Sequence, residues 1–463
     1  MKHFNFDKAF LYTVLEEALK NGGEYADLFF EDTKTNSISF LDKKVDDINL
    51  GVSYGVGLRV IVNKKTIYLY SNDTSNDSLI KLAKNASSVI KDSKHIPNMF
   101  VENSETINNH PLHINPFDVQ FDEKINTLSF LDKKAREVSD KIKQVSARYA
   151  EKQRNILVCT SKGVLKEDSQ TYVRLVMMSM ANDGNNTQTA SRTKGALDGY
   201  KVINDINLEE MAFETAKSAI KMLDSKYPKS GKYPVVIDNA FGGVIFHEAC
   251  GHALEATAVA DNASVFCNKL GTQIANECLT AIDDGTIENA WGSYNIDDEG
   301  NEAQRTVLIE NGILKSYLVD ELGSMKMNHA ITGSARRENY KYPPTSRMRN
   351  TFIDNGTSSF DELISKIEYG LYAKKMGGGS VNPATTDYNF SVSEAYLIEN
   401  GKITTPVRGA TLIGRGDETL MNIEAVSSNL ELADGMCGSV SGSVPTTVGQ
   451  PAIRVKELTV GGR

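Results

Sequence analysis

The first half of the chain alternates between apolar residues spaced as in helices and apolar residues spaced as in strands. A recurrence every three or four positions predicts helices over residues 8–20, 78–91, 121–143 and 208–223. Runs rich in β-branched and aromatic residues predict strands over residues 25–31, 37–41, 54–62, 67–70, 145–150, 156–160 and 171–180. The pattern therefore predicts an α+β fold, with a mixed N-terminal α/β region.

Glycine usage indicates a different architecture for the second half. Nine of the 35 glycines lie in residues 1–200, and the other 26 lie in the remaining 263 residues. Two strand-like runs end in Asn311-Gly312 and Asn400-Gly401, the dipeptide that type I′ hairpin turns prefer. A β-rich C-terminal domain that carries the metal motif described below is therefore expected.

We place the domain boundary in the polar, proline- and glycine-containing segment 225–231. This gives an N-terminal region over residues 1–228 and a C-terminal domain over residues 231–463. Segment 95–118 holds three prolines and no sustained periodicity, so it reads as a linker or surface excursion and marks an optional split of the first region. Its histidines, His95, His110 and His113, are irregularly spaced, which favours exposed loop residues over a second metal site.

The composition narrows the classes of function. With 40% hydrophobic and 24% charged residues, the chain resembles an ordinary soluble protein. A net charge of −9 argues against binding to nucleic acid or to an anionic membrane, since both need a basic face. No apolar run approaches the roughly 18 residues of a membrane span, and the start lacks a signal segment. Five scattered cysteines do not indicate a disulfide framework, so we expect a cytoplasmic protein.

The chemistry centres on a glutamate flanked by two histidines, His247-Glu248-Ala249-Cys250-Gly251-His252. On a regular α-helix, positions i and i+5 lie about 140° apart, so both imidazoles reach one ion only if the helix is distorted. Gly251 is the expected cause of a widened turn or a break. In the metal hypothesis the histidines are ligands and Glu248 is the general base. The alternative is a buried helix with two hydrogen-bonded histidines, but only seven histidines occur in the whole chain.

A catalytic zinc site needs a third protein ligand, and cysteine is the softest candidate. Cys159 lies in an apolar run and reads as a core residue, whereas Cys250 is too close in sequence to the histidines. Cys267 and Cys278 have ordinary surroundings. Cys437 lies between glycines in an expected loop, a good place to present a thiolate. The sequence thus predicts one divalent ion per chain, zinc from its two-nitrogen, one-sulfur ligand set, held by His247, His252 and Cys437.

Several further strings accompany this motif. They are Asp283-Asp284-Gly285-Thr286, Asn295-Ile296-Asp297-Asp298-Glu299-Gly300, Thr332-Gly333 with Arg336-Arg337-Glu338, Arg347-Met348-Arg349-Asn350-Thr351, Gly377-Gly378-Gly379, Ser393-Glu394-Ala395-Tyr396, and the tail from Val448-Gly449-Gln450-Pro451 to Gly461-Gly462. Together with His247-Glu248-x-x-x-His252 and the distant cysteine, they resemble the TldD branch of the TldD/PmbA family of metalloproteases.

The resemblance implies a function for each part of the motif. In that family the two histidines and the late cysteine bind the metal and the glutamate is catalytic; all four positions are filled here. The PmbA branch lacks this set, so the intact motif implies the catalytic branch. Family members resemble proteases of unfolded or modified peptides that are enclosed in a dimer, so we expect either a homodimer or a heterodimer with a PmbA-type partner.

Three further sets of residues are candidates for supporting roles. Glu255, one turn after His252, is an expected hydrogen-bond partner of a ligand imidazole. Arg336 and Arg337 either bind a substrate carboxylate or are structural. Gly377, Gly378 and Gly379 form a backbone strip that an extended peptide could approach closely. Two alternatives to a peptidase remain, namely a structural metal module with four protein ligands and a catalytically idle partner subunit.

Overall fold

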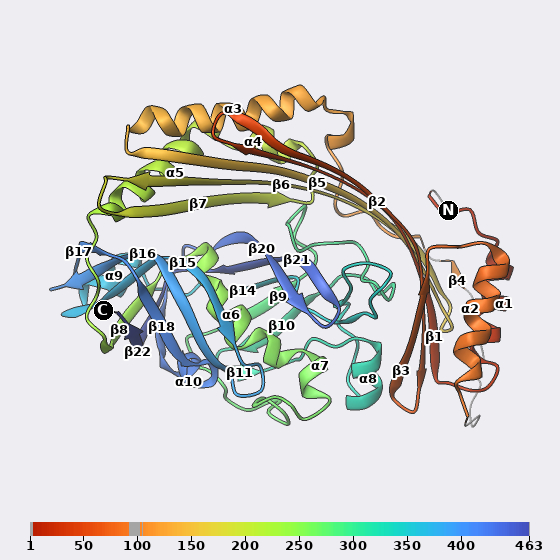
Figure 1. Cartoon of the computed structure of the whole chain (residues 1–463). Coiled ribbons are helices and arrows are strands. Elements are labelled where there is room, and N and C mark those ends of the chain that lie inside the picture. The colour runs from red at the N-terminus through yellow and green to blue at the C-terminus, as the bar shows by residue number, and fades with distance from the viewer. Residues whose placement is uncertain (1–2, 92–101, 104, 463) are drawn as a thin grey trace.

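The fold consists of a long arched, mainly antiparallel sheet that extends over a compact, β-rich C-terminal part (Figure 1). It is a computed structural model that describes residues 3–91, 102–103 and 105–462. The described residues contain both helices and strands, with the longer helices in the first half, which confirms the α+β prediction. No helix among them is long and apolar enough to cross a membrane.

The arched sheet is built from the N-terminal half. Its strands are β1 (Tyr25–Leu41), β2 (Lys44–Val62), β3 (Lys65–Ser71), β4 (Glu102–Asn103), β5 (Ile142–Thr160), β6 (Val164–Asn182) and β7 (Thr187–Ala196). The order is β3-β2-β1-β5-β6, with β4 and β7 both paired to β6. The sheet takes strands from both sides of segment 95–118. The domain limits and the optional split remain predictions.

Helices cover the sheet in two groups. They are α1 (Lys8–Leu19), α2 (Asn76–Ser88), α3 (Phe121–Val138), α4 (Lys201–Asp205) and α5 (Leu208–Leu223), with a 3-10 turn η1 (Pro116–Asp118) before α3. Helices α1 and α2 cover the Leu28 and Leu58 end of the sheet, whereas α3 and α5 cover the Ile38 and Leu175 end. Asp7 accepts a hydrogen bond from the first turn of α1, as a helix N-cap does.

Several boundaries in this half differ from the sequence prediction; the predicted strands 145–150 and 156–160, for example, are one strand, β5, and two further cases show the cause. The predicted strands 25–31 and 37–41 are one continuous strand, because the polar residues between them pair with both β2 and β5. Helix α3 ends at Val138 rather than near residue 143, because Ser139 is extended and Ile142 already begins β5. Hydrogen bonds to neighbouring strands decide both cases, and single-sequence periodicity does not include them.

The C-terminal half contains two larger sheets and a two-stranded ribbon. The first sheet is formed by β9 (Ala281–Asp284), β10 (Arg305–Glu310), β11 (Ile313–Leu314), β14 (Asn350–Ile353), β20 (Glu431–Ser439) and β21 (Gly442–Gln450). The second is formed by β8 (Gly231–Ile237), β15 (Tyr369–Val381), β16 (Asp387–Glu399), β17 (Lys402–Val407), β18 (Ala410–Arg415), β19 (Ile423–Val426) and β22 (Ile453–Gly461). The ribbon is β12 (Ala335–Arg336) with β13 (Thr345–Ser346). Because β15 also pairs with β16, five strands of the second sheet close into a ring.

Short helices connect the strands of these sheets. They are η2 (Ala240–Gly243), α6 (Val244–Ala249), η3 (Gly251–Leu254), α7 (Ala256–Val259), α8 (Glu321–Met327), α9 (Phe360–Ser365) and α10 (Gly416–Asn422). Asn311-Gly312 and Asn400-Gly401 have positive φ at both residues of each pair and connect antiparallel strands, which confirms the two predicted hairpin turns. Helix α6, which carries His247, packs in the largest hydrophobic core.

The predicted loop histidines have different surroundings. His110 is buried and its ring contacts the backbone of Tyr294 and Asn289, so the expectation that it is exposed is wrong. His113 is partly exposed and pairs with Asp198. His95 lies outside the described residues. The ring of His110 makes its hydrogen bonds with a buried backbone carbonyl and amide instead of with water. The spacing of the histidines in the sequence does not predict this.

Buried ion pairs join the arched sheet to the C-terminal half. Arg59 of β2 lies 2.6 Å from Asp27 of β1 and 2.7 Å from Glu299, and all three side chains are almost fully buried. Burial raises the pKa of Glu299 well above its usual range, against the lowering effect of Arg59. Arg154 of β5 makes a two-pronged contact with Asp298 at 2.9 and 3.1 Å. The two halves are therefore held together by charges that have little access to water.

Replacing Arg59 by methionine should destabilise the protein strongly. The change leaves Asp27 and Glu299 buried without their main cation, and breaking a buried pair in this way costs about 3–5 kcal/mol. Thermal denaturation should show a melting temperature several degrees lower, whereas Arg305→Met, at a half-exposed arginine, should change it little. An unchanged melting temperature in Arg59→Met would show that the pair does not hold the two halves together.

Candidate metal centre

The helix that carries the histidine motif is broken between its two histidines. Helix α6 ends at Ala249, Cys250 has the non-helical angles φ −128° and ψ −49°, and the 3-10 turn η3 begins at Gly251. The break turns the chain so that the ring centroids of His247 and His252 lie 5.1 Å apart at an interplanar angle of 84°. The distortion expected from the five-residue spacing is confirmed.

Gly251 is needed for a steric reason as well. A Cβ atom built on Gly251 would lie 2.1 Å from the sulfur of Met348, so any larger residue would displace that side chain or the turn. Met348 is itself almost fully buried. The sequence indicated that Gly251 relaxes the helix, but the close approach of Met348 depends on the tertiary structure.

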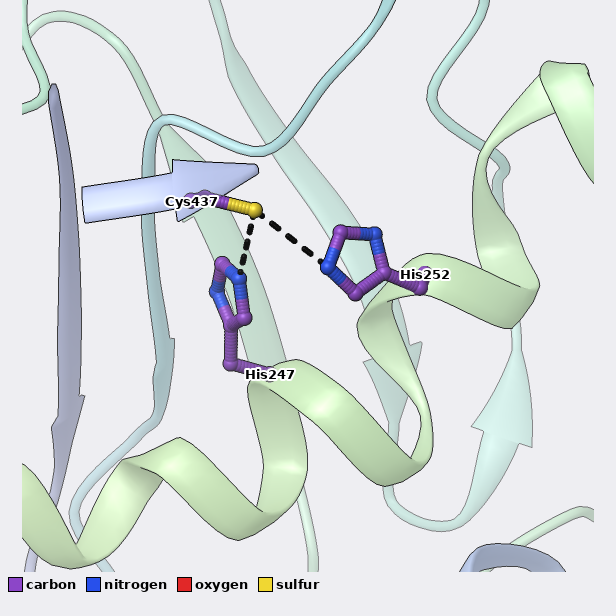
Figure 2. Close-up of side chains that lie close together, drawn as sticks. All are labelled: His247, His252 and Cys437. Atoms are coloured by element: carbon purple, nitrogen blue, oxygen red, sulfur yellow. Dashed lines mark hydrogen bonds between the residues drawn. The ribbon is translucent and has the colours of Figure 1, made fainter. Parts of the chain in front are cut away.

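Cys437 approaches the two imidazoles from the opposite side (Figure 2). It lies in β20, opposite Val444 of β21 in a hairpin, and it is 4% exposed. The expectation that it lies in a loop is therefore wrong. Its Sγ is 3.2 Å from Nε2 of His247 and 3.3 Å from Nε2 of His252. The three possible ligand atoms all lie within 4.8 Å of one another.

These three side chains shift one another's pKa. Burial raises the pKa of the Cys437 thiol, but contacts with His247 and His252 outweigh it and lower the pKa from 9.0 to about 3. Burial lowers the pKa of His252, yet Glu255 and Cys437 together raise it well above its ordinary value. Without a metal, the cluster therefore favours a thiolate beside a protonated imidazole.

Two carboxylates flank His252. Glu255 Oε2 is 3.1 Å from Nδ1, and its other oxygen accepts a hydrogen bond from the backbone of Met348. Glu248 Oε2 is 3.7 Å from Nε2, on the side that Cys437 also faces. The side chain of Glu255 is only 5% exposed, but that of Glu248 is 30% exposed and so has access to solvent. Glu255 is therefore positioned to orient the imidazole of His252, and Glu248 is positioned to exchange protons with a reactant.

The geometry fits a tetrahedral ion. With zinc–nitrogen and zinc–sulfur bonds of ordinary length, a nitrogen and a sulfur ligand are about 3.6 Å apart, close to the distances between Cys437 and the two histidines. Among the described residues, this is the one group of three His, Cys, Asp or Glu side chains that is placed to hold an ion. With two imidazoles and one thiolate as donors, a fourth position is left for water or substrate.

The other candidate residues lie apart from this cluster. Arg337 is buried over the ring of Phe29 at 4.1 Å and donates to the carbonyl of Asp298, and Arg336 donates to the carbonyl of Met348. These contacts suit the structural alternative, and carboxylate binding by either arginine remains a prediction. Gly378 and Gly379 lie in an exposed part of β15, with Gly377 partly exposed beside them.

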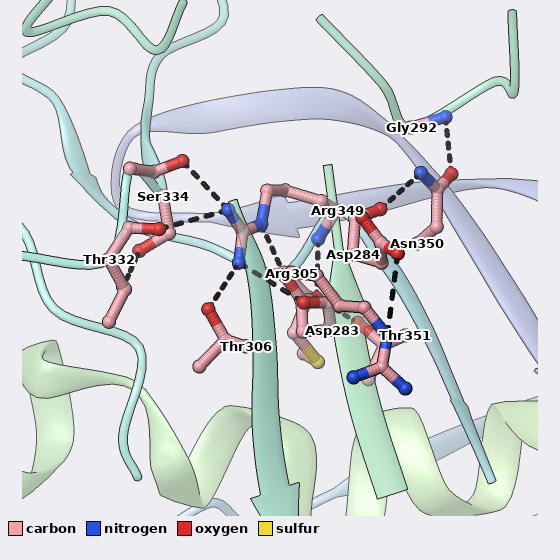
Figure 3. Close-up of polar contacts among 12 residues, drawn as sticks. Asp283, Asp284, Gly292, Arg305, Thr306, Thr332, Ser334, Arg349, Asn350 and Thr351 are labelled. Atoms are coloured by element: carbon pink, nitrogen blue, oxygen red, sulfur yellow. Dashed lines mark hydrogen bonds and ion pairs between the residues drawn. The ribbon is translucent and has the colours of Figure 1, made fainter. Parts of the chain in front are cut away.

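The roles of Arg347, Met348 and Arg349 were missed by the sequence interpretation, although their string was noted. Figure 3 shows Arg349 and Thr351 around Asp283, with Asn350 donating to the carbonyl of Asp284. This network fixes the segment whose Met348 contacts Gly251 and Glu255. The signal in the sequence was the pattern itself, one methionine between two arginines. All three residues are buried in the structure.

The whole chain is similar to known metalloproteases. Models of the PmbA/TldA metallopeptidase family match residues 26–90 as domain 1, residues 114–223 as the central domain and residues 230–462 as the C-terminal domain. The metalloprotease TldD homolog of Haemophilus influenzae is 36% identical over 449 residues, covering 95% of this chain and 93% of that protein. The zinc metalloprotease TldD homolog of Saccharolobus solfataricus is 27% identical over 98% of this chain and 100% of its own length.

The fold is similar to that of a solved structure with a more distant sequence. TldE from Thermococcus kodakarensis superposes with a TM-score of 0.80 at 16% identity, covering 98% of this chain and 100% of that one. At this level of identity the comparison concerns the arrangement of helices and strands. It includes both the arched sheet and the β-rich half.

In metal-free protein, Cys437 should be a thiolate at mildly acidic pH. Its lowered pKa means that the ionised form stabilises the fold, and that this contribution is lost as the pH falls toward about 3. Ultraviolet absorbance of the thiolate, followed against pH, should persist at about pH 6, where an ordinary thiol is protonated. Burial raises the pKa of Cys159 to about 12, so that thiol should not contribute.

The control is Cys437→Ser, which should remove the thiolate absorbance without changing the far-ultraviolet circular dichroism spectrum. A wild-type signal that disappears below about pH 8, as expected of an unperturbed cysteine, would contradict the geometry of the cluster.

Proposed function

This chain belongs to the PmbA/TldD family of metallopeptidases, and we propose that it is a zinc-dependent peptidase in which Glu248 is the general base. The observation that carries the proposal is the convergence of Nε2 of His247, Nε2 of His252 and Sγ of Cys437, with a carboxylate of Glu248 next to them. These side chains come from elements 185 and 190 residues apart in the sequence. A chance approach of three soft donors and an accessible carboxylate is a poor alternative explanation.

His247, His252 and Cys437 would hold the ion, one per chain. Two imidazoles and a thiolate are a donor set that zinc favours, and the relative from Saccharolobus solfataricus is named a zinc metalloprotease. Such an ion lowers the pKa of water to about 7 and polarises a peptide carbonyl. Glu255 would keep the His252 ring oriented through its Nδ1.

Glu248 would move the protons of the reaction. It takes a proton from the attacking water as the new carbon–oxygen bond forms, and it delivers that proton to the amine nitrogen as the carbon–nitrogen bond breaks. Its partial exposure and its distance of 3.7 Å from His252 suit this role, because the carboxylate is open to solvent beside the ligands. Transfer of one proton from water to the amine balances the hydrolysis.

The substrates would be unfolded or modified polypeptides bound in an extended conformation. Strand β15 pairs with β8 only from Leu371 to Ala373, so the edge that continues through Gly377, Gly378 and Gly379 has no strand partner on that side in the described residues. Glycines allow a peptide backbone to come close and to add as a further strand. Helix α6, which bears His247, contacts β15. Arg336 and Arg337 are retained as weaker candidates for contact with a substrate carboxylate.

We further propose that the chain works as a dimer, either with itself or with a PmbA-type partner, in the cytoplasm. The exposed edge of β2 supports the proposal that the chain forms a dimer. Ile48, Leu50 and Val52 are 44%, 67% and 75% exposed on one face of this strand, beside backbone groups with no strand partner in the described structure. Such an edge is a liability unless it is covered. The five free cysteines support a reducing compartment.

Glu248→Gln should retain the metal and lose hydrolysis. The amide keeps the size of the side chain but accepts no proton, so turnover of an unfolded polypeptide should fall by about 10²- to 10⁴-fold with unchanged zinc content. Glu302→Gln, at a side chain 70% exposed, should behave as wild type. Zinc-loaded wild-type protein that cleaves no peptide, alone or with a partner, would instead favour a structural metal module, and protein that binds no metal would favour an idle partner subunit.

Leu50→Lys should weaken the dimer. A charge in the centre of the exposed apolar row opposes its burial, so sedimentation should show a shift from dimer toward monomer. Val89→Lys places the same charge at another exposed apolar residue, outside β2, and should leave the assembly unchanged. Identical sedimentation of Leu50→Lys and wild-type dimers would exclude β2 as the interface.

A further inference from the structure

Arg347 differs from the other fully buried arginines in its charge partners. Four arginine side chains are less than 2% exposed, namely Arg59, Arg337, Arg347 and Arg349. Three of them pair with carboxylates: Arg59 with Asp27 and Glu299, Arg337 with Asp27, and Arg349 with Asp283 (Figure 3). Arg347 forms no ion pair with an acidic side chain in the described part of the chain. A buried cation without an anion is costly, so its surroundings need an explanation.

All side-chain hydrogen bonds of Arg347 go to the hairpin that carries Cys437. Nη2 donates to the carbonyl oxygen of Cys437 itself at 2.5 Å. Nη1 donates to Oγ of Ser441 at 2.9 Å and to the carbonyl of Gly442 at 2.8 Å. The planar guanidinium thus spans the hairpin from the strand residue to its turn, which fixes the hairpin in position and orientation.

The next residue supports the second histidine. The backbone N–H of Met348 donates to Oε1 of Glu255, whose other oxygen contacts Nδ1 of His252. The sulfur of Met348 packs against Gly251, at the break between the two histidines. Residues 347–348 therefore contact the groups that position two of the three ligand side chains, Cys437 and His252. Arg349, the next residue, ties this segment to Asp283.

We propose that Arg347 is a positioning residue of the metal site, which holds the backbone of Cys437 so that the sulfur faces both imidazoles. These contacts explain why an arginine is needed, since the donors of a lysine ammonium all lie on one nitrogen and cannot span Cys437, Ser441 and Gly442 as the planar guanidinium does. The inference rests on the proposed role of Cys437 as a ligand.

The test uses the full chain, made metal-free and titrated with Co²⁺, with zinc affinity measured by competition with a chromophoric chelator. The variants are Arg347→Lys, Arg347→Met and Ser441→Ala, and the control is Arg454→Met, an arginine that donates to the carbonyls of Glu362 and Leu363 away from the site. The absorbance of the thiolate–Co²⁺ contact, per ion bound, reports the placement of the sulfur rather than overall stability.

Loss of the guanidinium should weaken zinc binding by about 10- to 100-fold, the range seen when groups that orient ligands are removed, and should weaken the thiolate–Co²⁺ band. Arg347→Lys should show this with wild-type circular dichroism, Ser441→Ala should show a smaller effect, and Arg454→Met none. If Arg347→Met does not fold, the other two variants decide.

Two outcomes overturn the inference, and they are distinguishable. A wild-type protein without a thiolate–Co²⁺ band means that Cys437 is not a ligand, so the proposed metal site fails as well. A wild-type band that is unchanged in Arg347→Lys and Ser441→Ala, with unchanged zinc affinity, leaves the metal site intact and makes Arg347 a structural residue only.

Discussion

The structure depends on holding one thiolate and two imidazoles within a few ångströms of each other, with little access to solvent. Cys437 lies 3.2 and 3.3 Å from the two histidine rings, although it is 185 residues or more away in sequence. Bringing soft donors together costs chain entropy and desolvation, so the surrounding structure must fix each one independently. The break at Cys250 orients the two histidine rings toward each other, and the β20–β21 hairpin places the sulfur of Cys437 beside them.

The arched sheet takes part in this positioning. Asp434, three residues before Cys437, accepts hydrogen bonds from Arg174 of β6 at 2.7 Å and from Thr193 of β7 at 3.1 Å. Trp291 also donates to the carbonyl of Gly435 at 2.7 Å. The hairpin with the sulfur is thus held from the N-terminal half at one point and from Arg347 at another. Both halves of the chain therefore position the site, consistent with the buried ion pairs that join the two halves.

The sequence predicted what depends on local chemistry. The cap at Asp7, the two Asn-Gly turns and the distortion between His247 and His252 follow from a few neighbouring residues, and all are present. What it missed depends on partners distant in the chain. Cys437 looked like a loop residue because of its flanking glycines, yet pairing with β21 makes it part of a strand. The packing of Met348 on Gly251 and the unpaired charge of Arg347 appear only when the segments meet.

Metal content per chain tests the central claim most directly. Elemental analysis of protein purified without added metal, and again after reconstitution, should be run on wild type, His247→Ala and Cys437→Ala, with Cys278→Ala as a matched control at an exposed cysteine. The account predicts close to one zinc per wild-type and control chain, and almost none in the other two variants. Wild-type protein that takes up no metal after reconstitution, or zinc retained when both His247 and Cys437 are replaced, would contradict it.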